Sequence, residues 1–328
     1  MKELRTALSI AILIFVYGCK FDIPNDEPDI IEYDNIMIYT DLSSRMNKNP
    51  SDTLVINQIL DFFVSDCVKP GIKVNDRSAI SFSRANHQRS NCPSTKIDIG
   101  QFKNLEEKQQ FVNNKSESKN LSKSIFEFKS SVRCNYLERD NGGLDLLSLI
   151  YQEVNTGNHI KKPEYLISET DTTTLYFHNH LFIFTDGYLE YSTTAGSKDF
   201  YYGEPQIDAL RKFCRTNKVS PEEAIRNNQQ FKIRPLVSDN NKFINLYILE
   251  TDDRGFNAQK GTLKNTGDLS DNNILRLAWK VWAEESGFKH FEWRPITTAT
   301  NLPSDYVQKL IRQTKEKEPP TAACRNGG

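Results

Sequence analysis

Acidic and hydroxyl side chains follow two apolar runs of the sequence. Residues 36–40 lead into Asp41, and residues 181–184 lead into Thr185-Asp186-Gly187. If these runs are neighbouring parallel strands, their carboxyl ends meet at one crevice. Carboxylate and hydroxyl oxygens are the ligands that Mg²⁺, Ca²⁺ and Mn²⁺ accept. The pattern therefore predicts a site for one of these divalent cations, with Asp41, Ser43 and Asp186 as ligands and Ser44 and Asp145 as further candidates.

These motifs resemble the metal-ion-dependent adhesion site of a von Willebrand factor A domain. That site has an Asp-x-Ser-x-Ser turn after strand 1, a Thr after a Gly-rich turn, and an Asp in a Thr-Asp-Gly turn after strand 4. Asp41 and Ser43 match the first turn, and Asp186 matches the last. The resemblance covers about residues 35–315. It implies a domain that binds a partner, commonly through a carboxylate of the partner that completes the coordination of the metal.

Two positions depart from the family pattern, so the site is degenerate. Arg45 stands where the second Ser is expected, and Leu144 stands where the Thr is expected after Gly142-Gly143. A guanidinium aimed into the crevice would compete with a cation for the same carboxylates. The alternative to a metal site is one in which Asp41 and Asp186 pair with Arg45 or cap backbone amides.

The loop over residues 187–205 combines aromatic side chains with Ser, Thr and Gly, a mixture typical of binding surfaces. We expect it to contact a partner, although Tyr188 and Phe200 could instead pack the loop onto its own domain. The predicted contact residues are Arg45, Tyr188, Tyr191, Tyr201 and Tyr202.

Positioning these residues requires an α/β fold. Strand-like runs alternate with helical periodicity, which is typical of a mostly parallel sheet. We predict a doubly wound, six-stranded sheet of order 3-2-1-4-5-6 with helices on both faces, as in von Willebrand A and Rossmann-like folds. The strands are expected at 36–40, 78–82, 95–99, 181–187, 245–250 and 288–293, the third of them at an edge. Helices are expected from residue 55, over 104–134, after Gly143, from Ser270 to Gly287, and after Pro303.

The amino terminus resembles an export signal. A short charged start, an apolar run of about 11 residues and Gly18-Cys19 are typical of a bacterial lipobox, in which Cys19 carries the lipid. We expect a signal peptide at 1–18, the lipidated Cys19 with an acidic tether at 19–35, a von Willebrand A-like domain with insertions at 36–315, and a disordered tail at 316–328. The tether resembles those of surface lipoproteins of the Bacteroidota. The expected location is the bacterial outer membrane, facing the periplasm or the cell exterior.

Cysteine and histidine positions carry further expectations. An exported chain permits disulfides, and Cys92 and Cys134 lie in loop-like sequence and could pair, whereas Cys67 is expected to be a buried small hydrophobe. His178 and His180 would lie on one face of a strand. Because they precede strand 4, away from the crevice, we interpret them as structural rather than metal-binding.

Composition and motifs narrow the function further. The formal net charge of −1 offers no global basic field for nucleic acid. Motifs of common hydrolases, kinases and dinucleotide-binding enzymes are absent from the sequence. We expect a lipid-anchored, non-catalytic protein that binds a protein or surface polymer. The alternatives are a metal-free scaffold of an envelope complex and, less favoured, a metal-dependent hydrolase with Asp41 as nucleophile.

Overall fold

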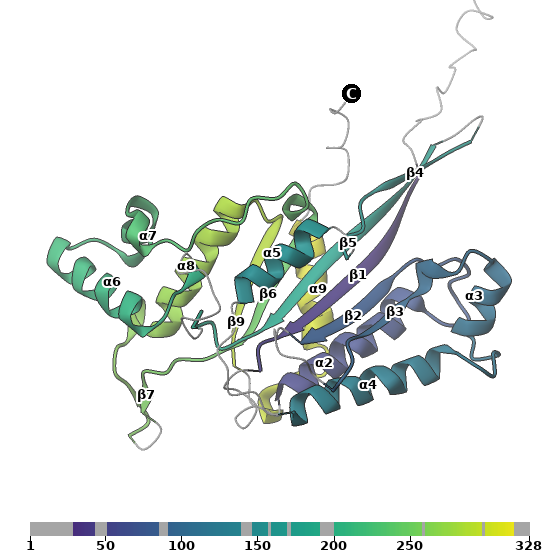
Figure 1. The fold of residues 1–328 in the computed structure, drawn as a ribbon, viewed down its shortest axis with the longest axis horizontal. Helices are drawn as coiled ribbons and strands as arrows, with labels where there is room; N and C mark the ends of the chain where they lie inside the picture. The colour runs from purple at the N-terminus through teal and green to yellow at the C-terminus, as the bar shows by residue number, and fades with distance from the viewer. Residues whose placement is uncertain are drawn as a thin grey trace, which may run out of the picture. The chain divides into compact units, whose positions relative to one another are not determined.

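A mostly parallel sheet forms the centre of the fold. The computed structural model describes residues 29–42, 51–84, 91–138, 146–156, 159–168, 172–190, 200–257, 260–296 and 299–317. Within them, a seven-stranded sheet has the order β3-β2-β1-β5-β6-β9, with β4 paired to β5 (Figure 1). Its strands are β1 (Ile30–Thr40), β2 (Ala79–Arg84), β3 (Thr95–Asp98), β4 (Glu164–Ile167), β5 (Thr172–Phe184), β6 (Ile244–Thr251) and β9 (His290–Pro295), and β7 (Phe256–Asn257) and β8 (Thr262–Leu263) form a separate ribbon.

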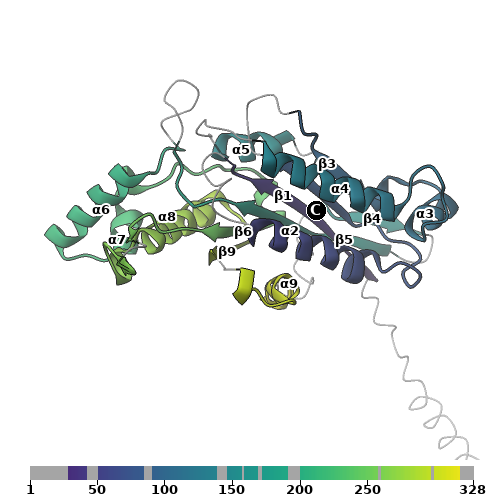
Figure 2. The same cartoon turned by 90° about the horizontal axis from the view of Figure 1, so that it is seen from below.

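Helices cover both faces of this sheet. One face is covered by α2 (Ser51–Phe62), α3 (Leu105–Val112), α4 (Leu121–Leu137) and α9 (Tyr306–Lys317). The other is covered by α5 (Leu146–Thr156), α6 (Glu204–Asn217), α7 (Pro221–Asn227) and α8 (Asp271–Ser286). Figure 2 shows α6, α7 and α8 grouped beside β6 and β9. A π-helical turn spans Phe63–Val68, and short 3₁₀ turns lie at Ile99–Gln101, Gln229–Phe231, Asn241–Phe243, Gly267–Leu269 and Ala299–Asn301.

The central strands are apolar on both faces because both faces are covered. Along β1, Met37 and Tyr39 enter the core beneath α5, whereas Ile36 and Ile38 enter the core beneath α2. Side chains alternate between the faces of a strand, so a strand buried on both sides is seen as a continuous apolar run. This explains why the runs before Asp41 and before Thr185 are recognisable in the sequence.

The predicted α/β class with helices on both faces is confirmed, but the prediction of a six-stranded sheet is wrong in part. The sheet has an additional strand, β4, and it is mixed: β2 and β3 are antiparallel, as are β4 and β5. The strand β5 begins at Thr172 rather than at Leu181. Its sequence runs Thr-Thr-Thr, Leu-Tyr-Phe and then the polar His-Asn-His, so the part before Leu181 lacks the long apolar run that marks a buried strand. The predicted edge position of β3 is confirmed.

The helix predictions are correct where the sequence carries end signals. Ser270 caps α8 by accepting a hydrogen bond from the Asn273 backbone N–H at 3.3 Å, and Gly287 ends it with φ of 82°. The single helix expected over 104–134 is instead two, α3 and α4, which Asn113 and Asn120 separate as C-cap and N-cap. The helices α6 and α7 are additional to those predicted.

A disulfide joins Cys92 and Cys134, as their sequence context allowed. Cys134 lies on α4 rather than in a loop, so the bond ties this helix to the segment before β3. Cys67 is free and buried, as predicted, and so is Cys214.

The chain divides into two compact units. The larger comprises residues 32–163 and 176–328, and the smaller comprises residues 1–31 and 164–175. The smaller unit contains β4, the start of β1 and the first residues of β5. In the part of the chain that the structure describes, no helix has the length and apolar composition to cross a membrane.

Candidate functional site

The Thr185-Asp186-Gly187 segment forms a tight turn at the carboxyl end of β5. Asp186 Oδ1 accepts a hydrogen bond from the Tyr188 backbone N–H at 3.1 Å, and Thr185 Oγ1 accepts one from the Gly187 N–H at 3.2 Å. Gly187 has φ of 92°, and a Cβ there would lie 2.7 Å from Cη2 of Trp293. The glycine is therefore required both by the left-handed backbone and by the close approach of the indole.

Asp41 lies beside this turn. Its backbone N–H donates to the carbonyl of Phe184 at 2.8 Å, which continues the pairing of β1 with β5. Thr185 Oγ1 donates to Asp41 Oδ2 at 3.3 Å. The predicted convergence of the strand ends that carry Asp41 and Asp186 is therefore seen, with Thr185 as the link between them.

A guanidinium neutralises Asp186, but it comes from Arg254 in the loop after β6. Arg254 Nη2 lies 2.8 Å from Asp186 Oδ2, and Nη1 lies 2.5 Å from Glu190 Oε2. The guanidinium carbon also lies 4.1 Å from the ring centroid of Tyr188. Burial alone would lower the pKa of Arg254, but Asp186 and Glu190 outweigh it and raise that pKa. Arg45, which the alternative to a metal site pairs with these carboxylates, lies outside the described residues.

A buried polar network extends from this pair toward α8. Tyr188 Oη donates to Asp271 Oδ2 at 2.6 Å and accepts from the Arg254 backbone N–H at 3.2 Å. Asp271 also pairs with Arg211 of α6, whose Nε donates to the carbonyl of Leu269 at 2.8 Å. Burial and the hydrogen bond to Asp271 raise the pKa of the Tyr188 phenol. The network therefore fixes the Tyr188 ring beneath the Arg254 guanidinium.

A third acidic residue ends β6 at the same sheet edge. Glu250 is fully buried, with φ of 62°, at an irregularity in the pairing of β6 with β9. Its Oε2 accepts a hydrogen bond from Ser51 Oγ, in the first turn of α2, at 2.8 Å. Since a helix amino terminus favours negative charge, α2 stabilises a carboxylate placed here.

An open groove of about 800 Å³ lies at this sheet edge, beyond the ends of β6 and β9. Its lining comes from the end of β6, the β8 ribbon, the start of α8 and the segment after β9. Asp253 organises its floor by accepting hydrogen bonds from the Asn272 N–H at 3.2 Å and the Gly255 N–H at 2.9 Å. Most lining side chains carry hydroxyl, carboxylate or amide groups, among them Thr251, Asp252, Asp253, Thr262, Thr266, Ser270 and Asn272, with Pro295 and Ile296 as apolar members.

The divalent-cation site stays a prediction, because part of its expected ligand set lies outside the described residues. Among them, no three His, Cys, Asp or Glu side chains lie close enough together to hold a metal ion. Arg254 also occupies the Asp186 oxygen that a cation would need. Ser43, Ser44 and Asp145, the remaining candidate ligands, lie outside the described residues.

The predicted aromatic contact surface requires a correction. Tyr188 and Tyr202 are buried, at 3 % and 1 % exposure, and Phe200 is buried as well. Tyr202 pairs its backbone with Leu189 through hydrogen bonds of 2.9 and 3.0 Å, which close the base of the loop. These rings pack the loop onto its own domain. Tyr201 is half-buried, and Tyr191 lies outside the described residues.

His178 and His180 lie within β5, in the interior of the larger unit. His180 Nδ1 lies 3.0 Å from Tyr247 Oη, and its Nε2 lies 3.1 Å from Asp34 Oδ1. Lys315 of α9 lies 2.6 Å from the same Asp34 oxygen. The two imidazoles stack on one face of the strand, with ring centroids 6.3 Å apart. These contacts agree with the structural interpretation.

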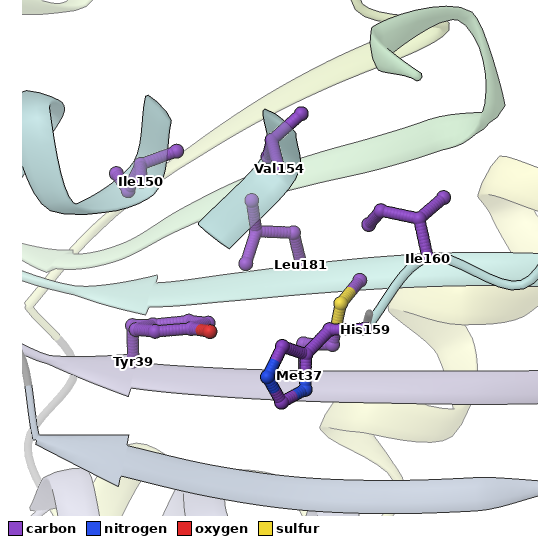
Figure 3. A pocket seen from close by; sticks show the side chains of 7 residues that line it. All are labelled: Met37, Tyr39, Ile150, Val154, His159, Ile160 and Leu181. Atoms are coloured by element: carbon purple, nitrogen blue, oxygen red, sulfur yellow. The ribbon is translucent and has the colours of Figure 1, made fainter. Parts of the chain in front are cut away.

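The core beneath α5 contains a cavity of about 10 Å³ between β1 and β5 (Figure 3). Its walls are mostly aliphatic, from Met37 and Leu181 on the strands to Ile150 and Val154 on the helix. A cavity must offer at least about 10–15 Å³ and several polar partners to hold one water. This cavity is therefore a packing defect rather than a ligand site.

Sequence reasoning missed Arg254, Glu250, Asp271 and Arg211. For Glu250 a signal existed, because the run 245–249 ends in an acid just as the runs before Asp41 and Asp186 do. Arg254 is the basic residue of an otherwise acidic Asp-Asp-Arg-Gly turn. Asp271 and Arg211 carry no local signal, because their pairing joins helices that are distant in the sequence.

Comparisons with known proteins leave the chain without an assigned family. No protein-family model and no curated protein matches it. One solved structure that it is similar to is proximal thread matrix protein 1 from the mussel byssus, at 13 % sequence identity and a TM-score of 0.24. That match covers 80 % of this chain, and the chain spans about half (49 %) of that structure.

Proposed function

We propose that this protein is a lipid-anchored envelope protein that binds a protein or surface polymer without catalysis, through the carboxyl edge of its sheet. The observation that carries the proposal is the open groove beside the Asp186–Arg254 pair. In open α/β sheets the crevice beyond the strand carboxyl ends is the usual ligand site. The resemblance to a von Willebrand A domain, carried by Asp41, Ser43 and Asp186, supports the same edge.

The proposed binding does not depend on a metal. The Arg254 guanidinium already places a positive charge against the Asp186 carboxylate, which is the group that a cation would bind. The guanidinium is held by two carboxylates and by the Tyr188 ring, so displacing it would break three contacts at once. A cation would have to replace these interactions as well as bind.

A catalytic role has less support at this edge. Asp41, the nucleophile of a hydrolase alternative, is only 7 % exposed and accepts the Thr185 hydroxyl. Although most residues that line the groove carry a polar group, its accessible surface is mostly apolar. Such a lining suits contact with the surface of a protein or with the apolar face of a surface polymer.

The proposal is tested by measuring how envelope fragments from the producing cells bind the full chain. Ile296 lines the groove and is 40 % exposed, so Ile296→Asp should fold normally and weaken binding by about tenfold through burial of an unpaired charge. Val237→Asp, at a 75 % exposed position outside the groove lining, is the matched control. Equal binding by both variants and the unmodified chain would exclude the groove.

Each of these measurements is repeated in Mg²⁺ and in EDTA. We expect the chelator to leave binding unchanged, because Arg254 rather than a cation neutralises Asp186. If EDTA abolished binding and Mg²⁺ restored it, the metal-dependent version of the function would be correct instead.

A further inference from the structure

Exposed apolar side chains gather in the smaller compact unit. In the described part of this unit, large hydrophobic residues lie on β4 and at the start of β1, and Ile167 is 81 % exposed. Soluble proteins usually scatter such residues singly, so a group of them indicates an interaction surface. The members are Ile30, Ile31, Tyr165, Leu166 and Ile167, which we name the hairpin surface.

The backbone explains why these side chains remain uncovered. The strand β4 pairs antiparallel with β5, placing Tyr165 opposite Thr174 and Leu166 opposite Thr173. Successive side chains of a strand point to opposite faces, so both faces of β4 are apolar. On the other side, the Thr174 N–H donates to the carbonyl of Asp29 at 2.8 Å, at the start of β1. Within the described residues, no further strand pairs with the outer edge of β4.

The occupant of this surface follows from where the chain enters the unit. Nine residues, 20–28, separate the lipid-modified Cys19 of the proposed function from Asp29. A fully extended chain of this length spans at most about 35 Å. The acyl chains at Cys19 would therefore hold the start of β1, and with it the hairpin surface, close to the bilayer.

We propose that the hairpin surface docks on the lipid bilayer as a second membrane contact of the anchored protein. This inference rests on the lipid anchor of the proposed function. Tyr and aliphatic side chains partition into the membrane interface, where the Thr hydroxyls of the neighbouring strand can meet headgroups and water. The contact would give the anchored protein a second point of attachment besides the lipid at Cys19.

A bilayer suits this surface better than a second copy of the chain does. A copy that added a strand to the outer edge of β4 would leave the faces bearing Tyr165 and Leu166 uncovered. A copy that covered one face would leave the other exposed. The interface of a bilayer can surround a two-sided ribbon, because it is fluid.

The test uses the full lipidated chain in phosphatidylcholine vesicles whose acyl chains carry bromine, which quenches indole fluorescence at short range. Leu166→Trp places the probe on the hairpin surface, at a position that is 48 % exposed, and Val237→Trp is the control outside it. Trp279, Trp282 and Trp293 are buried, so the unmodified chain supplies the background. Ile167→Trp is a second hairpin probe in case the first perturbs folding.

We expect brominated lipid to remove the emission added by either hairpin probe and to leave that of Val237→Trp unchanged. If the protein floats with the vesicles but the hairpin probes are not quenched, the docking proposal is wrong and the anchor stands. The emission of the hairpin probes could instead shift to the blue as more protein is bound per vesicle, with no effect of bromine. That result would assign the surface to self-association. If the protein does not float with vesicles, the anchor itself fails.

Discussion

Arg254 is the residue on which the geometry of the candidate site depends most. It joins Asp186, Glu190 and the Tyr188 ring, all of which come from the turn after β5. Sequence reasoning placed a guanidinium at these carboxylates only as the alternative to a cation, and assigned it to Arg45 of the matched motif. Among the described residues, the partner of Asp186 comes from a turn 68 residues further along the chain, and the pairing of β5 with β6 brings it close.

We therefore expect Arg254→Met to lower the free energy of unfolding by about 1–3 kcal/mol, because Asp186 would remain buried without its counter-charge. Arg226→Met is the control, since Arg226 also joins two carboxylates, those of Glu222 and Glu284, but at an exposed position. Arg226→Met should lower the free energy of unfolding by less than about 1 kcal/mol. Urea titration measures both, and equal losses would contradict the structural role assigned to Arg254.

Gly187 provides a second test at a single residue. Gly187→Ala would place a methyl group against Trp293 in addition to imposing a left-handed backbone on alanine. We expect the free energy of unfolding, measured by thermal or urea unfolding, to fall by about 2–4 kcal/mol. Gly261 has φ of 60°, and a methyl group added there would meet no atom within 4 Å, so Gly261→Ala should cost only about 1 kcal/mol. Identical losses would show that the contact with Trp293 does not matter.

Among the elements, α4 is held by a covalent bond as well as by packing. The Cys92–Cys134 disulfide spans a sequence separation of 42 residues. Closing a loop of that length stabilises the folded state by about 4 kcal/mol in the chain-entropy model. Cys134→Ser should lose stability of this order, and reductant should lower the unfolding midpoint of the unmodified chain but not of the variant. Cys214→Ala, at a free buried cysteine, is the control that should leave the reductant effect intact.

We expect the free energy of unfolding to depend on pH, because His180 of β5 is buried where this strand contacts β1 and α9. Burial lowers the pKa of His180 from 6.5 to about 4, against the opposing effect of Asp34. Between these values the unfolded chain binds more protons than the folded chain, so stability falls as the pH is lowered through this window. Across this window, His180 lowers the free energy of unfolding by about 3 kcal/mol in total.

Substitution isolates this contribution. His180→Gln should reduce the slope of unfolding free energy against pH by up to one proton between pH 6.5 and 4. His290→Gln, at a partly exposed histidine of β9, is the control. An unchanged slope in His180→Gln would show that the imidazole is not held neutral. Burial alone would raise the pKa of Asp34, but His180 and Lys315 hold it well below its usual range, so its own contribution is lost only at lower pH.

Elements that the sequence revealed are those with strong local signals. Ser270 and Gly287 mark both ends of α8, and the apolar runs mark β1 and the second half of β5. The strand β4 has four residues, all exposed, and β5 begins with three threonines, so neither provides a periodic apolar signal. The helix α6 has a narrow apolar face, through Ile207 and Leu210, that becomes informative only when the partner helices are known.

For the whole molecule, the sequence predicted which strand ends converge but not which side chain pairs with Asp186. Parallel strands that end in acids place those acids at one edge, whatever the details of packing. Which charge neutralises them depends on contacts between segments far apart in the sequence, such as the pair of Arg211 and Asp271, which are 60 residues apart. The cation stays a prediction, and the pairing of the Arg254 guanidinium with Asp186 could not be predicted for this reason.

The most direct test of the central claim is site-specific photocrosslinking in the cells that produce the protein. A photoreactive phenylalanine analogue replaces Ile296 in the groove, and the same analogue replaces Val237 as the control. The proposed function predicts a discrete adduct with a protein or surface polymer from Ile296, unchanged by chelator and absent from Val237. Adducts from both positions alike, or from neither, would contradict the assignment of the groove as the binding surface.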